Sequence, residues 1–317
     1  MELSVVIPVL NEAATVRELC ARLRMAIEPI TTDYEIVFVG GGSMDGTEDA
    51  ILKQRADDAR VKLLWLSRNF GHQEALTAGM DYAGGDAVIM MDGDLQHPPE
   101  VLPRLITEWR RGYEVVRSLR LSTAEVSRFK RVSSRAFYGL INRISDLDMA
   151  DGSADFRLLD RVAVNALRSM PERSRFLRGM VRWIGFSQAV VPYHADARKT
   201  GTTKYPVQRL VTFALRATLS FSAAPLYLVA VFGWIFASLG FLYAMFAIAM
   251  KLFNDVPIIG WASVLASLLF MGGVQLIAIG VAGAYIAKIF EETKARPVYL
   301  VRHAYGFANP TTTAEER

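Results

Sequence analysis

Two long stretches without charged residues constrain the fold of this chain more than any other feature of its sequence. Residues Ala217 to Met250 and Val256 to Ala287 contain no Asp, Glu, Lys or Arg. A helix needs about 20 consecutive apolar residues to cross a bilayer. The sequence therefore predicts a multi-pass membrane protein, with transmembrane helices at 223–250 and 260–288 joined by a short non-cytoplasmic loop at 251–259.

The charges around these stretches predict their orientation. The loop between the two stretches holds one Lys and one Asp. Basic residues flank the stretches on their other sides: Arg209 and Arg216 precede the first, and Lys288, Lys294 and Arg296 follow the second. The positive-inside rule then places both chain ends in the cytoplasm. Residues 1–204 begin with a strand-like segment in place of a basic signal-peptide start, so we expect a cytoplasmic domain there and a cytoplasmic tail at 289–317. The single cysteine, Cys20, suits a reducing compartment.

The segment 205–222 leads into the first predicted span. Apolar residues recur in it at helical spacing, with Arg209 and Arg216 among them. This pattern predicts an amphipathic helix, either in the membrane interface or packed on the soluble domain. A net charge of +4 fits contact with an anionic lipid surface. The chain has no basic helix or aromatic platform, so we expect no nucleic-acid partner.

The first 110 residues alternate between strand-like and helix-like patterns. The predicted strands are 5–9, 35–39, 61–66 and 87–91, and the predicted helices are 13–27, 47–55, 76–82 and 100–109. Such alternation predicts an α/β domain, with a parallel sheet covered by helices on both faces. Ligands of open α/β sheets bind beyond the carboxyl ends of the strands.

Polar residues follow three of these predicted strands. Asp92 and Asp94 come directly after strand 87–91, where hard carboxylate oxygens could hold Mg²⁺ against phosphates; the alternative is an ordinary Asp-Gly turn. Asn11 follows strand 5–9 and could bind a base or ribose, or simply cap the next helix. The glycines after strand 35–39 do not match G-x-G-x-x-G, because Asp45 stands where the third glycine would fall.

Several ordered motifs resemble family 2 glycosyltransferases with the GT-A fold. They are Pro8-x-x-Asn11-Glu12, Gly42-Ser43-x-Asp45-Gly-Thr47, Ser67-Arg68-Asn69-Phe70-Gly71 and Asp92-Gly-Asp94-Leu-Gln96-x-Pro-Pro-Glu100. Later motifs resemble the polyprenyl-phosphate glycosyltransferases: Gly152-Ser-Ala-Asp155-Phe-Arg157, Phe176-Leu-x-Gly179, Gly272-Gly-Val-Gln275 and Glu292-Thr-Lys-x-Arg296-Pro. That group includes the bactoprenol glucosyltransferases and, more distantly, dolichol-phosphate mannose synthase.

The resemblance implies a GT-A nucleotide-binding domain with a mostly parallel sheet, and a metal-dependent, inverting hexose transfer. The favoured donor is UDP-glucose and the acceptor is undecaprenyl or another polyprenyl phosphate, at the cytoplasmic face of the bacterial inner membrane. The product would be a lipid-linked sugar for cell-envelope glycan modification, such as that of O-antigen. We further expect a homo-oligomer in the lipid bilayer, coupled to a flippase and a second glycosyltransferase.

The resemblance also implies roles for individual residues. Mg²⁺ or Mn²⁺ would be held by Asp94 and Gln96 with Asp92 close by, and would neutralise the leaving diphosphate. Donor-binding residues would be Pro8, Asn11, Glu12, Gly41, Ser43, Asp45, Arg68, Asp92 and Arg198. The acceptor phosphate would be bound by Arg120, Arg131, Ser134 and Lys204. Asp92, Asp94 and Asp155 would form the catalytic group.

Plainer interpretations remain open for several of these residues. Arg198 could be a surface arginine, and the basic residues from Arg117 to Arg135 could form a solvated face. Asp155 could pair with Arg157; a phosphate acceptor is largely deprotonated at neutral pH, so we expect Asp155 to orient a substrate more than to act as a base. His72 and His97 lack metal-ligand spacing, and we expect them to be structural or to support the ligand-binding residues.

The sequence departs from the family pattern at two glycines. Relatives carry Asp or Asn and then Asp before Gly42-Ser43, whereas this chain has Gly40 and Gly41. Ala284 likewise stands where relatives tend to carry Glu. These glycines suggest a non-catalytic membrane partner as one alternative, and a processive polysaccharide synthase, which is similar up to the metal motif, is another. A processive synthase needs a Gln-x-x-Arg-Trp motif, which this chain lacks, because Gly179 stands where the Gln would precede Arg182-Trp183.

Overall fold

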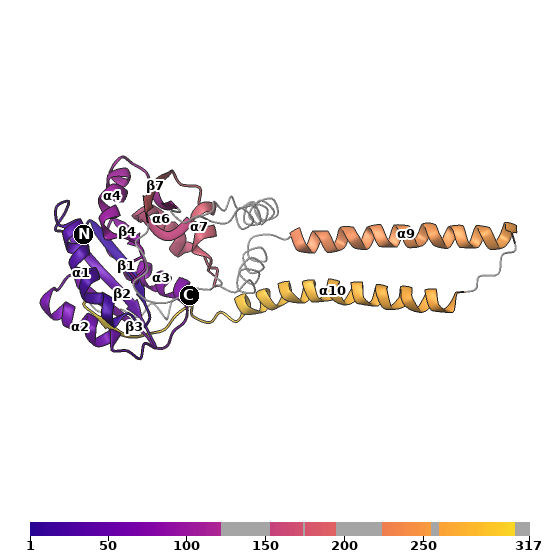
Figure 1. Cartoon of the computed structure of the whole chain (residues 1–317), viewed down its shortest axis with the longest axis horizontal. Helices are drawn as coiled ribbons and strands as arrows, with labels where there is room; N and C mark the ends of the chain where they lie inside the picture. The colour runs from indigo at the N-terminus through magenta and orange to yellow at the C-terminus, as the bar shows by residue number, and fades with distance from the viewer. Residues whose placement is uncertain (122–152, 174, 195–223, 255–259, 308–317) are drawn as a thin grey trace. The chain divides into compact units, whose positions relative to one another are not determined.

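The computed structural model describes residues 1–121, 153–173, 175–194, 224–254 and 260–307 (Figure 1). These residues divide into two compact units. One unit contains the described residues up to His194 together with those from Arg296 onward, and the other contains the two long helices. The predicted helix at 205–222 lies outside the described residues.

The first unit is built on a sheet whose described strands follow the order β7-β5-β6-β4-β1-β2-β3-β8. The strand bounds are β1 Leu3–Val9, β2 Tyr34–Gly40, β3 Val61–Leu66, β4 Ala87–Met90, β5 Val115–Leu121, β6 Ser153–Asp160, β7 Gln188–His194 and β8 Val301–Tyr305. β1 pairs in parallel with β2 and β4, β2 with β3, and β5 with β7. β6 and β8 pair antiparallel to their neighbours. The predicted α/β fold with a mostly parallel sheet is confirmed.

Helices cover both faces of this sheet. Their bounds are α1 Ala13–Ile27, α2 Thr47–Asp57, α3 His72–Tyr82, a 3-10 turn η1 Pro99–Val101, α4 Leu102–Arg110, α6 Arg161–Ser169 and α7 Leu177–Trp183. Val16, Leu19 and Leu23 of α1 are buried in one core with alternate residues of β1, because their spacing puts them on one helix face. On the other face α3 packs so closely on β1 that a Cβ at Gly79 would lie 2.1 Å from Val6 Cγ1.

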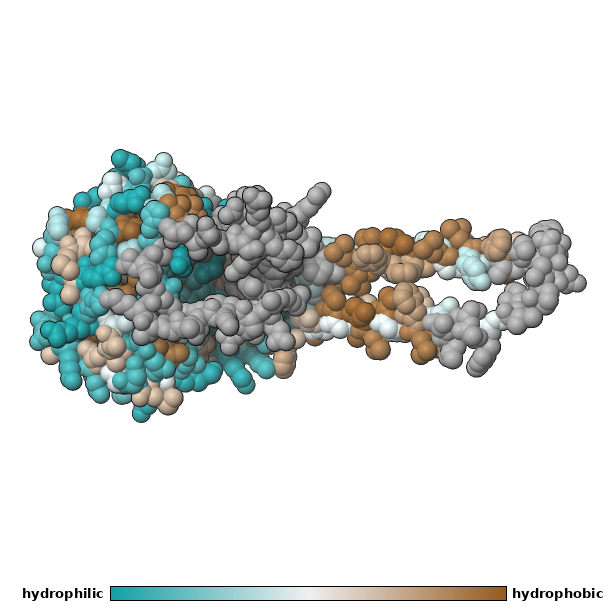
Figure 2. Space-filling model, viewed as in Figure 1, coloured by the Kyte–Doolittle hydropathy of each residue, from teal (hydrophilic) through white to brown (hydrophobic). Residues whose placement is uncertain are grey.

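The second unit contains α9, Ala224–Asn254, and α10, Trp261–Thr293. The windows Leu226–Tyr243 and Ser267–Thr293 are long and apolar enough to cross a membrane. Figure 2 shows hydrophobic residues exposed along these helices, and none of either window is buried inside the protein. Because large apolar surfaces are unfavourable in water, these exposed faces favour a lipid environment. Phe236 and Phe270 meet edge to face at 6.0 Å between ring centroids.

The segment after α10 returns to the sheet of the first unit. β8 pairs antiparallel with β3, with Leu64 opposite Ala304. The backbone N–H of Ser67 donates to the Leu300 carbonyl at 2.9 Å, and the Tyr299 hydroxyl donates to Asp81 at 2.8 Å. The sequence predicted only a tail here. Residues far apart in the chain therefore complete one edge of the sheet.

Candidate functional site

A cavity of about 310 Å³ opens where the central parallel strands end. Its walls come from the residues at and just beyond the carboxyl ends of β1, β2 and β3, from the start of α3, and from the loop after β4. They are Pro8–Leu10, Glu12, Val39–Gly41, Leu66, Arg68–His72, Ala75 and Asp92–Asp94. The cavity lies at the sheet edge where ligands of such folds bind. Of the predicted donor residues described by the structure, it brings together Pro8, Glu12, Gly41, Arg68 and Asp92.

Asn11, Ser43 and Asp45 join the loop after β1 to the loop after β2, and they do not belong to the cavity wall. The backbone N–H of Asn11 donates to Ser43 Oγ at 3.1 Å, and Asn11 Oδ1 accepts from the Met44 N–H at 3.0 Å. Asp45 accepts from the Ala13 N–H at 3.0 Å. The suggestion that Asn11 caps α1 is wrong, because the N-cap is Glu12 and Asn11 adopts a φ of +56°.

Gly40 and Gly41 form a side-chain-free part of the wall. A Cβ at Gly40 would lie 2.7 Å from the Trp65 ring, and one at Gly41 would lie 2.8 Å from the carbonyl oxygens of Leu66 and Arg68. These distances are too short for any side chain unless its neighbours move. The packing around the loop therefore requires glycine at both positions, and Trp65 fills the space that a side chain at 40 would use.

The Asp92-Gly-Asp94 motif lies in the loop after β4. The carboxylate of Asp94 accepts the Gln96 backbone N–H at 3.1 Å and the Gln96 side-chain amide at 2.7 Å. His97 Nδ1 accepts the Asp92 backbone N–H at 3.0 Å, and its ring stacks on Phe156 at 5.0 Å between centroids. Burial lowers the pKa of His97 because it disfavours the charged ring, and the neutral ring is the form that can accept the Asp92 N–H.

The residues of this loop fit a divalent cation in part. Asp92 and Asp94 are half-buried and both line the cavity, so their carboxylates could offer hard oxygen donors to a cation there. Gln96 gives its amide N–H to Asp94 and holds that carboxylate in place. Within the described ranges, no group of three or more His, Cys, Asp or Glu side chains is arranged around a common metal position. A cation here would take its remaining ligands from substrate and water.

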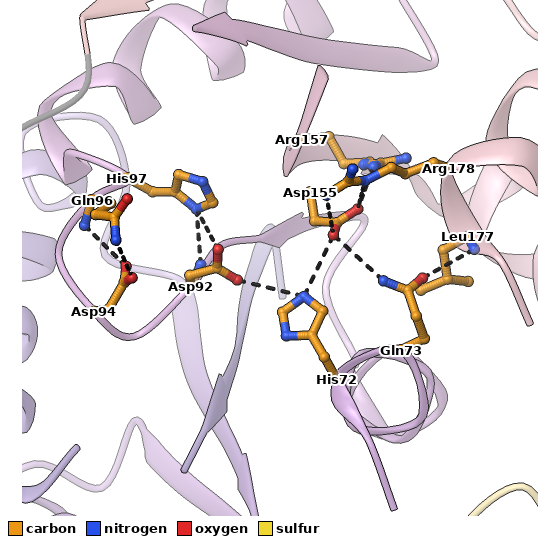
Figure 3. A network of polar contacts seen from close by, with 10 residues as sticks. All are labelled: His72, Gln73, Asp92, Asp94, Gln96, His97, Asp155, Arg157, Leu177 and Arg178. Carbon is orange, nitrogen blue, oxygen red and sulfur yellow. Dashed lines mark hydrogen bonds and ion pairs between the residues drawn. The ribbon is translucent and has the colours of Figure 1, made fainter. Parts of the chain in front are cut away.

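His72 lies between Asp92, in the loop after β4, and Asp155. Its Nε2 lies 3.5 Å from Asp92 Oδ1 and 3.5 Å from Asp155 Oδ2 (Figure 3). Burial lowers the pKa of His72, but the hydrogen bond and charge of Asp155 and the charge of Asp92 outweigh it, and the net shift is upward. The expectation that His72 is structural or supports the ligand-binding residues did not identify these two partners.

Asp155, buried in β6, is held by cations. Arg157 Nη2 donates to Oδ1 at 2.8 Å, and Arg178 donates to both carboxylate oxygens at 2.9 Å. Gln73 Nε2 approaches Oδ2 at 3.4 Å. Burial raises the pKa of Asp155, but hydrogen bonds from His72 and Arg178 and the charges of both arginines hold it well below its ordinary value. The suggested pairing with Arg157 is confirmed, and it extends to a cluster (Figure 3).

Among the predicted acceptor residues, Arg120 belongs to the part of the chain that the structure describes. Arg120 is exposed near the end of β5, opposite Tyr193 of β7. The other predicted acceptor residues, Arg131, Ser134 and Lys204, lie outside the described residues, and so does the predicted donor residue Arg198. The sequence reasoning missed Gln73 and Arg178. Arg178 occupies the unspecified position of Phe176-Leu-x-Gly179, so the motif did not single it out. Its bidentate contact with Asp155 becomes visible only in the folded structure.

Comparison with known proteins identifies relatives of the whole chain. The glycosyl transferase family 2 model matches residues 4–168. The sequence is 38% identical to an uncharacterized glycosyltransferase, YkcC, of Bacillus subtilis over 98% of this chain and 96% of that protein. It is 40% identical to the bactoprenol glucosyl transferase of Shigella phage SfX over 95% of this chain and 99% of that protein.

Solved structures with a related arrangement are more distant. The glucosyl-3-phosphoglycerate synthase of Mycobacterium tuberculosis, crystallised with Mn²⁺, UDP and glucosyl-3-phosphoglycerate, aligns with a TM-score of 0.46 at 20% identity. The alignment covers 69% of this chain and 77% of that one. Staphylococcus aureus TarS in complex with UDP-GlcNAc aligns with a TM-score of 0.46 at 18% identity, over 68% and 66% of the two chains.

Proposed function

The chain belongs to glycosyl transferase family 2, and from this premise we propose that it transfers glucose from UDP-glucose to a polyprenyl phosphate. One observation carries the proposal. The similarity to bactoprenol glucosyl transferases covers 95% of this chain, so it includes the catalytic domain and the two apolar helices alike. A glycosyl transferase family 2 domain attached to two apolar helices suits a reaction between a soluble donor and a lipid acceptor.

The cavity supports the donor side of this reaction. Asp94 and Asp92 would hold Mg²⁺ or Mn²⁺, which supplies charge neutralisation to the departing diphosphate. Gln96 keeps the Asp94 carboxylate in one orientation, and the exposed Arg68 adds positive charge at the wall. The side-chain-free wall at Gly40 and Gly41 lets a nucleoside approach the backbone. Arg198 would complete the diphosphate contacts.

The acceptor supplies its own nucleophile. The second pKa of a phosphate monoester is about 6, so its oxygen is already largely deprotonated at neutral pH. Asp155 therefore need not act as a base, and its clamp by two arginines keeps it ionised and fixed. Direct attack by the phosphate oxygen on the anomeric carbon would invert its configuration. Arg120, Arg131, Ser134 and Lys204 would bind the acceptor phosphate, since guanidinium and ammonium groups suit phosphate.

The two apolar helices support a location of this protein in the bacterial inner membrane. Basic residues precede the first predicted span and follow the second, as the positive-inside rule requires of cytoplasmic ends. The catalytic domain at 1–204 and the segment from 289 onward would both face the cytoplasm, where UDP-glucose is found. Homo-oligomer formation and coupling to a flippase and a second glycosyltransferase belong to the same proposal.

A non-catalytic membrane partner is the second candidate. It is favoured by Gly40 and Gly41, which replace polar residues of the family pattern and leave no room for a side chain. The intact carboxylates of Asp92, Asp94 and Asp155 favour the active enzyme instead.

The experiment offers the purified full chain undecaprenyl phosphate, Mg²⁺ or Mn²⁺, and a panel of UDP- and GDP-sugars. Glycolipid formed from UDP-glucose alone supports the proposal, and formation from another single donor changes the sugar but keeps the reaction class. Absence of product from every donor, by a protein that still unfolds cooperatively, would favour the non-catalytic role.

A further inference from the structure

His72 lies between the cavity and the buried polar cluster. It is the first residue of α3, and the preceding Gly71 adopts a φ of +129° that turns the chain into the helix. The imidazole forms part of the cavity wall, and 42% of the side chain is exposed. A substrate in the cavity would therefore meet this ring.

The imidazole joins two carboxylates that come from neighbouring strands. Asp92 follows β4 and Asp155 lies in β6, which pairs antiparallel with β4. His72 Nε2 is equally distant, at 3.5 Å, from one oxygen of each (Figure 3). Two carboxylates this close repel each other, and a ring N–H between them offsets that repulsion.

Asp155 has little capacity left for a substrate. Its side chain is 7% exposed, and both of its oxygens already accept hydrogen bonds from guanidinium groups. Asp92 is more accessible, at 35% exposed, and reaches the cavity wall. Any influence of Asp155 on the reacting groups must therefore pass through a side chain that touches both the cluster and the cavity. His72 is in that position.

We propose that His72 is a positioning residue, which orients the Asp92 carboxylate toward the donor site and is itself held by Asp155. Asp155 then acts through His72, and Asp155 is itself held in place by Arg178 and Arg157. This inference rests on the proposed glycosyl transfer, because it assigns Asp92 to the donor side of that reaction. The order of contacts is Asp155, His72, Asp92 and then the donor.

The kinetic test uses the full chain and two amide variants of different reach. A Gln side chain places its amide nitrogen about where His72 Nε2 lies, whereas Asn is too short. His72→Asn should lower kcat about 10–100-fold, as expected for loss of a supporting hydrogen-bond partner. UDP affinity measured by calorimetry should stay within about threefold, because the nucleoside contacts are elsewhere. His72→Gln should recover most of kcat. The exposed His303 provides the control, since His303→Asn should leave kcat unchanged.

The kinetic outcomes separate the possibilities. Wild-type kcat in His72→Asn, or a Gln variant as slow as the Asn variant, would overturn the positioning role. A parallel fall of kcat and UDP affinity would also overturn it, because His72 would then be a donor-binding residue. A wild-type chain inactive with every donor would instead reject the proposed function.

A spectroscopic test does not depend on activity. The chain has four histidines, so each imidazole ¹⁵N resonance can be assigned by single substitutions in the full chain in micelles. Asp92→Asn and Asp155→Asn should each shift the His72 Nε2 resonance and leave that of His303 in place. An unchanged His72 resonance in the Asp92→Asn protein would contradict the bridge, even if Asp155→Asn fails to fold.

Discussion

Arg178 and Asp155 meet through two parallel hydrogen bonds, from Nε to Oδ1 and from Nη2 to Oδ2, each 2.9 Å long. This bidentate geometry joins α7 to β6, and Gln73 of α3 reinforces it by accepting the Leu177 N–H at 3.1 Å. Three elements from distant parts of the sequence are thereby fixed around one carboxylate. The arrangement keeps Asp155 ionised and fixed, which fits the orienting role proposed for it.

Replacing Arg178 by Lys should show how much the bidentate contact with Asp155 contributes to stability. Lysine keeps the charge but cannot make two parallel bonds, so we expect the free energy of unfolding to fall by about 1–2 kcal/mol. Denaturant titration of the full chain in micelles measures this loss. Arg111→Lys is the matched control, because Arg111 is exposed and pairs with Glu108 at the surface. Equal effects of the two changes would contradict the clamp.

His97 should make the protein less stable in acid. Burial lowers the pKa of His97, so below about pH 6.5 the unfolded chain binds a proton that the folded chain resists. Stability should therefore fall as the pH drops from about 6.5 toward the folded pKa. His72 has the opposite sign, since its pKa is raised and its contribution is present below about pH 6.5.

The variant His97→Asn separates these two effects. Asn can still accept the Asp92 N–H but cannot titrate, and the His72 contribution is common to both proteins. Unfolding midpoints at pH 7.5 and 5.5 should differ more for the wild type than for the variant. An equal or smaller loss in the wild type would contradict the assignment of a neutral, buried His97.

Gly40 and Trp65 should behave as a compensated pair. A Cβ at position 40 would lie 2.7 Å from Trp65 Cζ3, so Gly40→Ala alone should cost about 1–3 kcal/mol of folding free energy. In a Trp65→Leu background the same change should cost less. Gly84→Ala is the control, since its nearest contact is the flexible end of Met1 at 3.2 Å. Strict additivity in the double-mutant cycle would show that the two positions are independent.

Tyr299 should tie the segment after α10 to α3. Its hydroxyl donates to Asp81 Oδ2 at 2.8 Å, and burial raises the pKa of Tyr299. Tyr299→Phe removes this hydrogen bond to the Asp81 carboxylate, so we expect a loss of about 1 kcal/mol. Thermal unfolding measures it, with the exposed Tyr113→Phe as the control. No difference between the two variants would mean that the contact does not stabilise the fold.

Local patterns predicted the elements whose apolar residues are periodic. The helix at 13–27 and the strand at 61–66 have the predicted bounds. The helix was recognisable because its buried residues recur at helical spacing, and the strand because it is a short apolar run that is almost entirely buried. α3 begins at His72, earlier than predicted, since His72 and Gln73 are polar and the apolar pattern starts only near Leu76.

The parts that the sequence did not predict depend on contacts between distant residues. β8 reads Val-Arg-His-Ala-Tyr, which has no clear alternation, and it becomes a strand by pairing with β3. Arg178 and His72 gain their importance only where β6, α7 and α3 meet at Asp155. Conversely, Asp92 and Asp94 were placed correctly beside the cavity, because a parallel sheet puts its strand ends at one edge.

The most direct measurement follows radiolabelled glucose from UDP-glucose into undecaprenyl phosphate by the purified full chain. We predict a labelled lipid whose formation stops when EDTA removes divalent cations and resumes when Mg²⁺ or Mn²⁺ is restored. Asp94→Asn should lose product formation while its unfolding midpoint stays close to that of the wild type. Release of free glucose without labelled lipid, or full activity of Asp94→Asn, would contradict the account.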